Sequence, residues 1–261
     1  MSTSCVRLGL FGYGKMGEAF ADILKEKCEV YVYDIVEERL KVAESRGLKV
    51  SRSAREIAEL CDIWFISVRP QDVEDLAREI GSLASGRLVI SIVAGLETSR
   101  LESYFPGSRV VRLMPNINVR VRHAVIALCP GKTASRDDVE LVKKLLEGGG
   151  IVIEIPEKLM PAYTMIGGVT PALAAYFADA LAWSGVLLGL DSSTSLKIVA
   201  HILIGTGKHL LEKKPDEIIE MVATPGGVTI ESIEYLEKEG VKGKIMESIK
   251  QGLEKERRLK G

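Results

Sequence analysis

A glycine-rich turn near the amino terminus carries the clearest chemical pattern in this sequence. The pattern is Gly12-x-Gly14-x-x-Gly17, and it follows an apolar stretch of strand length. Gly12 permits a tight turn, Gly14 lets a pyrophosphate approach the main chain, and Gly17 lets the next helix pack closely against the strand. The start of that helix offers free N–H groups and a positive dipole to phosphate oxygens. The predicted cofactor contacts here are Gly12, Gly14, Lys15, Met16 and Gly17, with the Lys15 side chain pointing to solvent.

Asp34 indicates which dinucleotide this turn would bind. It ends the next apolar stretch and lies 22 residues after Gly12, close to the ~20 expected for an acid that accepts a ribose hydroxyl. A carboxylate suits the adenosine ribose of NADH and repels the 2′-phosphate of NADPH, and residues 35–38 add glutamates rather than arginine. We therefore expect NADH to be the favoured cofactor, with NADPH as the alternative. Glycine is common (25 of 261 residues), so the motif depends on the strand, the helix and Asp34 around it.

Strand and helix patterns alternate through roughly the first 155 residues, as in folds built from βαβ units. Continuous apolar runs such as residues 63–68 and 88–93 are typical of parallel strands covered on both faces. This alternation predicts an α/β fold, with an N-terminal Rossmann-type, doubly wound, mostly parallel sheet. Ligands bind at the carboxyl ends of the strands in such sheets. The predicted cofactor contacts at these ends are Asp34, Val68, Arg69, Pro70, Ala94 and Asn116.

Two of these residues also fit ordinary structural roles. Asn116 follows a strand end after Pro115, where it either reaches the nicotinamide side or forms an Asx-turn. Arg69 either contacts the phosphate or ribose of the cofactor or is simply solvated. The sequence leaves both alternatives open.

Helical patterns alone continue after residue 156. We expect a dinucleotide-binding domain over residues 1–156 and an all-helical domain over residues 157–261. Asp179 is the only charged residue within residues 159–190, so this stretch imitates a membrane span. Glycines and a proline interrupt it at residues 167–171, and we expect a buried helix at a subunit interface instead. A helix that is apolar on all sides needs partners on all sides, which predicts at least a homodimer.

Composition argues against several classes of partner. The net charge of −1 gives no reason to expect nucleic acid or an anionic membrane. The cysteines form no C-x-x-C pair, which is typical of reduced, mostly buried thiols in a cytosolic protein. The three histidines show no ligand spacing, so no metal site is expected. The amino terminus lacks the pattern of a signal peptide, which also predicts a cytoplasmic protein. The cysteines are Cys5, Cys28, Cys61 and Cys129.

Five motifs follow one another along the chain: Gly12–Gly17, Val68–Gln71, Ser91–Gly95, Leu113–Asn116 and Thr224–Thr229. Together they resemble the successive motifs of pyrroline-5-carboxylate reductases. The order and spacing agree over essentially the whole sequence, and the T-P-G-G-V-T loop is the most specific part because such a loop between helices is unusual. The resemblance implies reduction of the C=N bond of 1-pyrroline-5-carboxylate to L-proline by NADPH or NADH, in proline biosynthesis. It also implies that the helical domain builds the dimer and that dimers often assemble further.

The resemblance also implies roles for residues in the helical domain. Thr229 matches the family threonine beside the ring nitrogen of the substrate and is the predicted catalytic residue. Hydride transfer to a protonated imine asks mainly for positioning and exclusion of water, which a loop of glycines and hydroxyls can provide. Helix N-capping is the alternative role for Thr224 and Thr229. The predicted substrate-binding residues are Thr224, Gly226, Gly227 and Thr170.

One loop departs from the family pattern. The family's S-G-S-G-P-A-Y stretch corresponds here to residues 167–173, where both serines and the tyrosine are replaced and Thr170 stands for a glycine. A buried carboxylate needs hydrogen-bond donors, so Thr170 either supplies one or the substrate is a different cyclic imine or ketone. Two alternatives therefore remain beside the reductase: a related imine reductase or other small-molecule dehydrogenase, and a nucleotide-binding regulatory protein.

Overall fold

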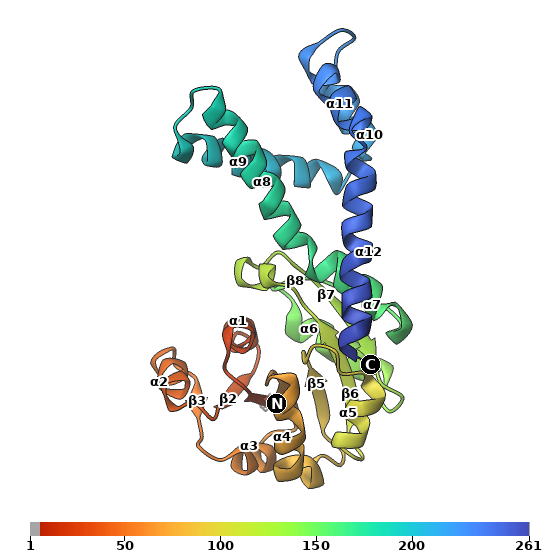
Figure 1. The fold of residues 1–261 in the computed structure, drawn as a ribbon. Helices are drawn as coiled ribbons and strands as arrows, with labels where there is room; N and C mark the ends of the chain where they lie inside the picture. Colours follow the sequence, from red (N-terminus) through yellow and green to blue (C-terminus); the bar gives the residue numbers. More distant parts are fainter. Residues whose placement is uncertain (1–5, 261) are drawn as a thin grey trace. The chain divides into compact units, whose positions relative to one another are not determined.

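The structure of the protein, a computed structural model, describes residues 6–260, apart from the side chains of residues 257, 259 and 260 (Figure 1). Residue contacts divide the chain after Gly168 into two compact units, which we describe separately. The first unit is α/β and the second is helical, as predicted. The division falls later than residue 156 because the helical turns after the last strand pack on the sheet, where Met160 contacts Ala127 and Cys129.

The first unit is built on a single sheet. In the described part of the chain its eight strands are ordered β3-β2-β1-β4-β5-β6-β7-β8. Neighbouring strands are parallel, except that β6 and β7 are antiparallel. The winding reverses between β1 and β4, which is the arrangement of a doubly wound Rossmann fold and confirms the predicted fold class. The strands are β1 (Arg7–Phe11), β2 (Glu29–Tyr33), β3 (Lys49–Val50), β4 (Ile63–Ile66), β5 (Leu88–Ser91), β6 (Arg109–Met114), β7 (Ala124–Pro130) and β8 (Gly150–Glu154).

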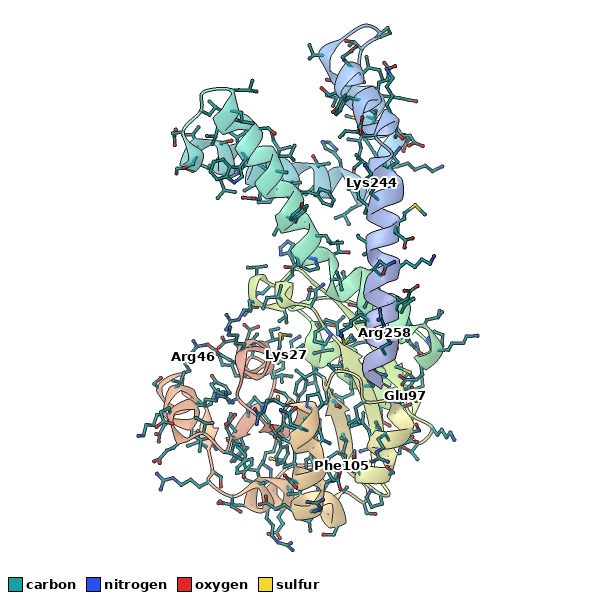
Figure 2. The ribbon with its side chains drawn as sticks, viewed as in Figure 1. Lys27, Arg46, Glu97, Phe105, Lys244 and Arg258 are labelled. Carbon is teal, nitrogen blue, oxygen red and sulfur yellow. The ribbon has the colours of Figure 1, made fainter. Side chains whose placement is uncertain are left out.

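Helices cover both faces of this sheet (Figure 1). One core contains buried side chains of α1, α2 and α6, and the other contains those of α3, α4 and α5. All four side chains of β4 are buried, as its continuous apolar run predicts. Phe105 lies inside the second core, where its ring meets that of Trp64 edge-on at 6.2 Å (Figure 2). The helices are α1 (Lys15–Leu24), α2 (Glu37–Ser45), α3 (Ala54–Leu60), α4 (Val73–Ile80), α5 (Thr98–Tyr104) and α6 (Arg136–Leu146).

A π-helical turn ends the first unit. After β8 the chain forms a 3-10 turn, Glu157–Leu159, then α7 (Met160–Tyr163) and the π-helix Thr164–Gly168. The glycines that were predicted to interrupt the apolar helix thus fall in the π-turn. At Gly167 a Cβ would overlap the ring of Tyr163, so a larger residue would require that ring to move. Turns of this kind are rare and are frequent at functional sites.

The described part of the second unit consists of helices. Its first two helices pack against each other, where Ser195 Oγ donates to the carbonyl of Ala182 at 2.6 Å and Gly185 leaves room for that serine. Large apolar side chains stay exposed along both helices, among them Tyr176, Leu187 and Ile202. Exposed apolar surface of this extent marks an interaction site. The helices are α8 (Thr170–Leu187), α9 (Ser192–Leu210), α10 (Pro215–Val222), α11 (Val228–Lys238) and α12 (Val241–Lys260).

Candidate cofactor and substrate sites

The backbone of the glycine-rich turn has the geometry that its pattern requires. Gly12 has a φ of +97°, and its N–H donates to the carbonyl of Tyr33 at 2.8 Å. Gly14 is the N-cap of α1, and no heavy atom lies within 4 Å of where its Cβ would be. At Gly17 a Cβ would overlap the Gly12 carbonyl and lie 2.6 Å from the Ser67 hydroxyl. The first N–H groups of α1 are therefore open to phosphate oxygens.

Asp34 connects the end of β2 to this turn. Its Oδ2 accepts the N–H of Tyr13 at 2.7 Å, and its Oδ1 accepts the N–H of Val36 at 2.8 Å. The guanidinium of Arg39 lies 3.2 Å from Oδ2, so the buried carboxylate is paired as well as hydrogen-bonded. The carboxylate therefore holds the turn in place and still has accepting positions left for a ligand.

A cavity of about 380 Å³ opens at the reversal point of the sheet, beside the turn. Five predicted cofactor residues line it: Gly12, Gly14, Asp34, Val68 and Arg69. The chain also places carboxylates there that sequence reasoning did not select: Asp72, Asp75 and Glu79. A cavity at this point in an open α/β sheet is where nucleotides bind.

Ser67 and Arg39 line the same cavity and were missed in the sequence. The Ser67 hydroxyl donates to the carbonyl of Gly12 at 2.8 Å and so fixes the turn from the neighbouring strand end. Its position directly after the buried run of β4 was the available signal. Nothing in the local sequence marks Arg39, because its contact depends on how α2 leaves β2.

The other predicted cofactor residues lie near this edge of the sheet without lining the cavity. Lys15 is exposed, as predicted, and Met16 is half-buried in the first turn of α1. Ala94 is exposed beyond the end of β5, and Pro70 begins a 3-10 turn. Arg69, which does line the cavity, is exposed, and its guanidinium pairs with both oxygens of Asp72, at 2.7 and 3.2 Å. Its charge is thus already engaged within its own turn.

Asn116 forms the Asx-turn that was the alternative to cofactor contact. Its Oδ1 accepts the N–H of Asn118 at 3.1 Å, and its amide nitrogen donates to the carbonyl of Gly167 at 2.9 Å. The end of β6 is therefore joined to the π-turn within the first unit. Each polar group of the Asn116 amide keeps one further hydrogen-bonding position, so the turn does not exclude a ligand contact.

A buried ion pair joins β6 to the 3-10 turn that follows β8. Arg112 on β6 pairs with Glu157, whose other oxygen accepts the N–H of Thr98 at 3.2 Å. The Arg112 side chain is only 3% exposed, so its charge depends on that partner. Burial raises the pKa of the neighbouring Cys129 thiol to about 11, and the Glu157 carboxylate adds to the effect.

Three cysteines of the described chain are buried: Cys28, Cys61 and Cys129. Burial raises the pKa of the Cys61 thiol to about 12. The fourth, Cys5, lies outside the described residues. Between residues 6 and 260 no group of three or more His, Cys, Asp or Glu side chains is arranged to hold a metal ion.

The predicted substrate loop lies in the second unit, between α10 and α11. Gly226 has a φ of +70°, and the N–H of Gly227 donates to the carbonyl of Thr224 at 2.9 Å, which closes a tight turn. Gly227 is the N-cap of α11, without a side-chain cap, so neither threonine caps this helix. Thr229 lies in the first turn of α11 and is half-buried. Within the described residues, neither hydroxyl has a hydrogen-bond partner.

Thr170 begins α8, where Pro171 occupies the first turn. Its side chain is exposed, and Val169 rather than Thr170 is the N-cap. Thr170 thus lies two residues after the end of the π-turn.

Sheet order, glycine turn and cavity together define a nucleotide-binding protein of the Rossmann type. Two family models match the chain: "NADP oxidoreductase coenzyme F420-dependent" over residues 7–95 and "Pyrroline-5-carboxylate reductase dimerisation" over residues 157–259. The second match begins next to the domain boundary expected at residue 156.

Curated relatives match over nearly the whole chain. Pyrroline-5-carboxylate reductase of Aquifex aeolicus is 33% identical, and that of Methanosarcina acetivorans is 32% identical, each covering 97% of both chains. This chain belongs to the pyrroline-5-carboxylate reductase family, and it is an oxidoreductase.

Solved structures agree in fold. Plasmodium falciparum pyrroline carboxylate reductase with NADP bound has a TM-score of 0.86 at 27% identity and covers 98% of each chain. The 1-pyrroline-5-carboxylate reductase of Streptococcus pyogenes has a TM-score of 0.87 at 26% identity, covering 97% of this chain and 98% of its own.

Proposed function

We propose that this protein reduces the C=N bond of 1-pyrroline-5-carboxylate to L-proline, with a nicotinamide dinucleotide as hydride donor. The observation that carries the proposal is the full-length match to curated reductases, together with the T-P-G-G-V-T loop. In the reaction a hydride adds to the imine carbon, the electron pair of the C=N bond moves to the protonated nitrogen, and oxidised cofactor leaves. Positioning the two reactants and excluding water is then the main task of the protein.

The residues proposed for the substrate lie on the loop before α11. Thr229 is the proposed catalytic residue beside the ring nitrogen, and its unpaired, half-buried hydroxyl supports that role. The start of α11 has no side-chain cap, so its free N–H groups suit the substrate carboxylate. The proposed substrate-binding residues are Thr224, Gly226, Gly227 and Thr170.

NADH is the proposed preferred cofactor. Asp34 lines the cavity with three further carboxylates, against two guanidinium groups, so the cavity disfavours the additional charge of a 2′-phosphate. The proposed cofactor contacts are the predicted set, Gly12, Gly14, Lys15, Met16, Gly17, Asp34, Val68, Arg69, Pro70, Ala94 and Asn116, extended by Ser67. Comparing KM for NADH and NADPH tests the preference, and a lower KM for NADPH would contradict it.

The protein is proposed to act as a cytoplasmic homodimer or higher homo-oligomer, joined through the helical unit and without a membrane or nucleic acid. The helical stretch Glu157–Leu187 is long and apolar enough to cross a membrane, but the core helix of a soluble protein passes the same test. The matching dimerisation family model and the exposed apolar side chains of α8 and α9 support burial against a second subunit.

One assay distinguishes the candidate functions. NADH oxidation is followed with 1-pyrroline-5-carboxylate and with a panel of other cyclic imines and ketones. We expect turnover on 1-pyrroline-5-carboxylate. Turnover only on another compound would identify a related imine reductase or dehydrogenase, and NADH binding without turnover would indicate a nucleotide-binding regulatory protein.

A variant pair tests the role of Thr229. Thr229→Val should lower kcat by about tenfold or more, on the scale of one lost hydrogen bond in the transition state. Thr206→Val makes the same change at a half-buried position in α9, outside the loop, and should leave kcat unchanged. Equal activity of the two folded variants would remove Thr229 from the mechanism.

A further inference from the structure

The pairing of Arg39 with Asp34 bears on how the cavity distinguishes the two nicotinamide cofactors. Arg39 Nη1 lies 3.2 Å from one oxygen of Asp34 and 3.5 Å from the other. The Arg39 side chain is 50% exposed, whereas that of Asp34 is 3% exposed. A half-exposed cation thus neutralises a buried anion at the place where a nucleotide ribose would bind.

Asp34 does not depend on Arg39 for its position. The main-chain N–H groups of Tyr13 and Val36 hold one oxygen each, at 2.7 and 2.8 Å. A carboxylate has about four accepting positions, so two remain for Arg39 and a ligand. A ribose hydroxyl can take one position and leave Arg39 the other. Arg39 can also leave altogether without releasing Asp34.

Other charges of the cavity, apart from that of Glu79, are already matched. Arg69 pairs with Asp72, and Asp75 pairs with Arg78 on the same helix. Among the described residues that line the cavity, this leaves Glu79 as the carboxylate without a cationic partner and Arg39 as the guanidinium that a ligand can recruit. Without Arg39, the cavity would hold two carboxylates that lack a cationic partner, Glu79 and Asp34.

We propose that Arg39 is a specificity-determining residue that permits binding of a nucleotide with a 2′-phosphate. With a free 2′-hydroxyl it stays paired with Asp34, and with a 2′-phosphate it turns to the phosphate, which a planar guanidinium binds in a charge-assisted contact. Asp34 favours NADH, and Arg39 limits the size of that preference. The inference rests on the proposed function only in taking a nicotinamide dinucleotide as the cofactor.

Two adenosine phosphates test this without any turnover. The compounds 5′-AMP and 2′,5′-ADP differ only in the 2′-phosphate, and their Kd values are measured by calorimetry at low salt. Arg39→Gln should weaken the binding of 2′,5′-ADP by about tenfold or more, because a charge-assisted contact is lost. It should change the Kd of 5′-AMP by less than about threefold. Arg39→Lys keeps the charge but loses the planar guanidinium with its paired N–H donors. Its affinity for 2′,5′-ADP should lie between those of Arg39→Gln and the unchanged protein.

A second variant tests the coupling. Asp34→Asn removes the charge and keeps an oxygen for one of the two main-chain donors, Tyr13 N–H and Val36 N–H. In the folded variant, 2′,5′-ADP should bind about tenfold more tightly than to the unchanged protein. That gain should be smaller in the double variant Asp34→Asn with Arg39→Gln, because the part of the gain that comes from a released guanidinium is lost and only the relief of repulsion by Asp34 remains. Additive effects of the two changes would contradict a shared role.

Arg52→Gln is the matched control. Arg52 pairs with Glu37 at 2.7 Å, is 83% exposed and does not line the cavity. Arg52→Gln changes the net charge of the protein by the same amount as Arg39→Gln. The proposal would be overturned if Arg39→Gln and Arg52→Gln changed the affinity for 2′,5′-ADP equally. It would also be overturned if Arg39→Gln weakened the binding of 5′-AMP and 2′,5′-ADP equally. The two nucleotides carry no nicotinamide, and only their binding is measured. Failure of the imine assay would therefore leave this outcome unaffected.

Discussion

The side-chain amide of Asn116 donates a hydrogen bond to the main-chain carbonyl of Gly167 at 2.9 Å, which joins the end of β6 to the π-turn. Gly167 lies so close to the ring of Tyr163 that a larger residue there would have to displace the ring. Tyr163 in turn donates its hydroxyl to the carbonyl of Val125 on β7 at 2.5 Å. The π-turn is therefore attached to two strands immediately before the chain enters the helical unit.

Replacing Asn116 tests whether this attachment matters for activity. Asn116→Ala should lower the unfolding free energy by about 1–3 kcal/mol, because the Gly167 carbonyl loses its donor and the Asx-turn is lost. It should also lower kcat, since the π-turn precedes the proposed substrate residue Thr170. Thermal unfolding and NADH oxidation measure the two effects.

The chain offers a matched control in its only other asparagine, Asn118. The contact of Asn118 with Asn116 uses its main-chain N–H, which alanine retains. Asn118→Ala should therefore be close to neutral. Similar losses in both variants would show that the Asn116 amide has no special role.

Two glycines of the turn should respond differently to alanine. Gly14→Ala should fold normally, because its Cβ meets no protein atom within 4 Å, yet weaken NADH binding by occupying the space for the pyrophosphate. Gly17→Ala should destabilise the protein itself by about 1–3 kcal/mol, because the Cβ overlaps the Gly12 carbonyl. NADH titration and thermal unfolding of both variants separate the two effects, and unchanged NADH affinity in Gly14→Ala would contradict the proposed phosphate site.

Local patterns in the sequence were sufficient for the fold and for part of the site. The glycine turn and the strand ends follow from residue types at short spacing, so Gly12, Gly14, Asp34, Val68 and Arg69 were found among the residues that line the cavity. In those cases the same short segment determines both the conformation and the chemistry.

Contacts between distant segments could not be derived in this way. Ser67 reaches Gly12 across 55 positions, and Asn116 reaches Gly167 across 51, so no local spacing reveals either bond. Arg39 is near Asp34 in sequence, but its role depends on which other charges of the cavity are already paired. The role of Thr229 rests on family resemblance and stays a prediction until the variant is measured.

Breaking the buried ion pair should destabilise the first unit. Glu157→Gln leaves the Arg112 guanidinium, 3% exposed, without its carboxylate, and should cost about 2–4 kcal/mol of unfolding free energy, less than for a pair buried on both sides because Glu157 is 27% exposed. Glu154→Gln removes a carboxylate from an exposed pair with Arg136 and should cost about 0–1 kcal/mol. Urea unfolding of both variants provides the comparison, and a similar small loss in each would show that Arg112 gains little from its partner.

Stability should fall in alkaline solution because of the buried thiols. Burial raises the pKa of Cys61 from 9.0 to about 12 and that of Cys129 to about 11. Between about pH 9 and pH 11 the unfolded chain releases these protons while the folded protein retains them, so the unfolding free energy decreases as the pH rises. Each thiol contributes roughly 1.4 kcal/mol per pH unit in that range.

Cys61→Ala isolates one of these contributions. The variant should be less stable than the unchanged protein at pH 7, because a fully buried side chain becomes smaller, but its stability should fall less steeply above pH 9. Tyrosines that titrate in the same range are present in both proteins, so the difference between the two curves reports the Cys61 thiol alone. Urea unfolding at pH 7 to 11 under reducing conditions measures both curves, and parallel curves above pH 9 would show that the Cys61 thiol ionises equally readily in the folded and unfolded states.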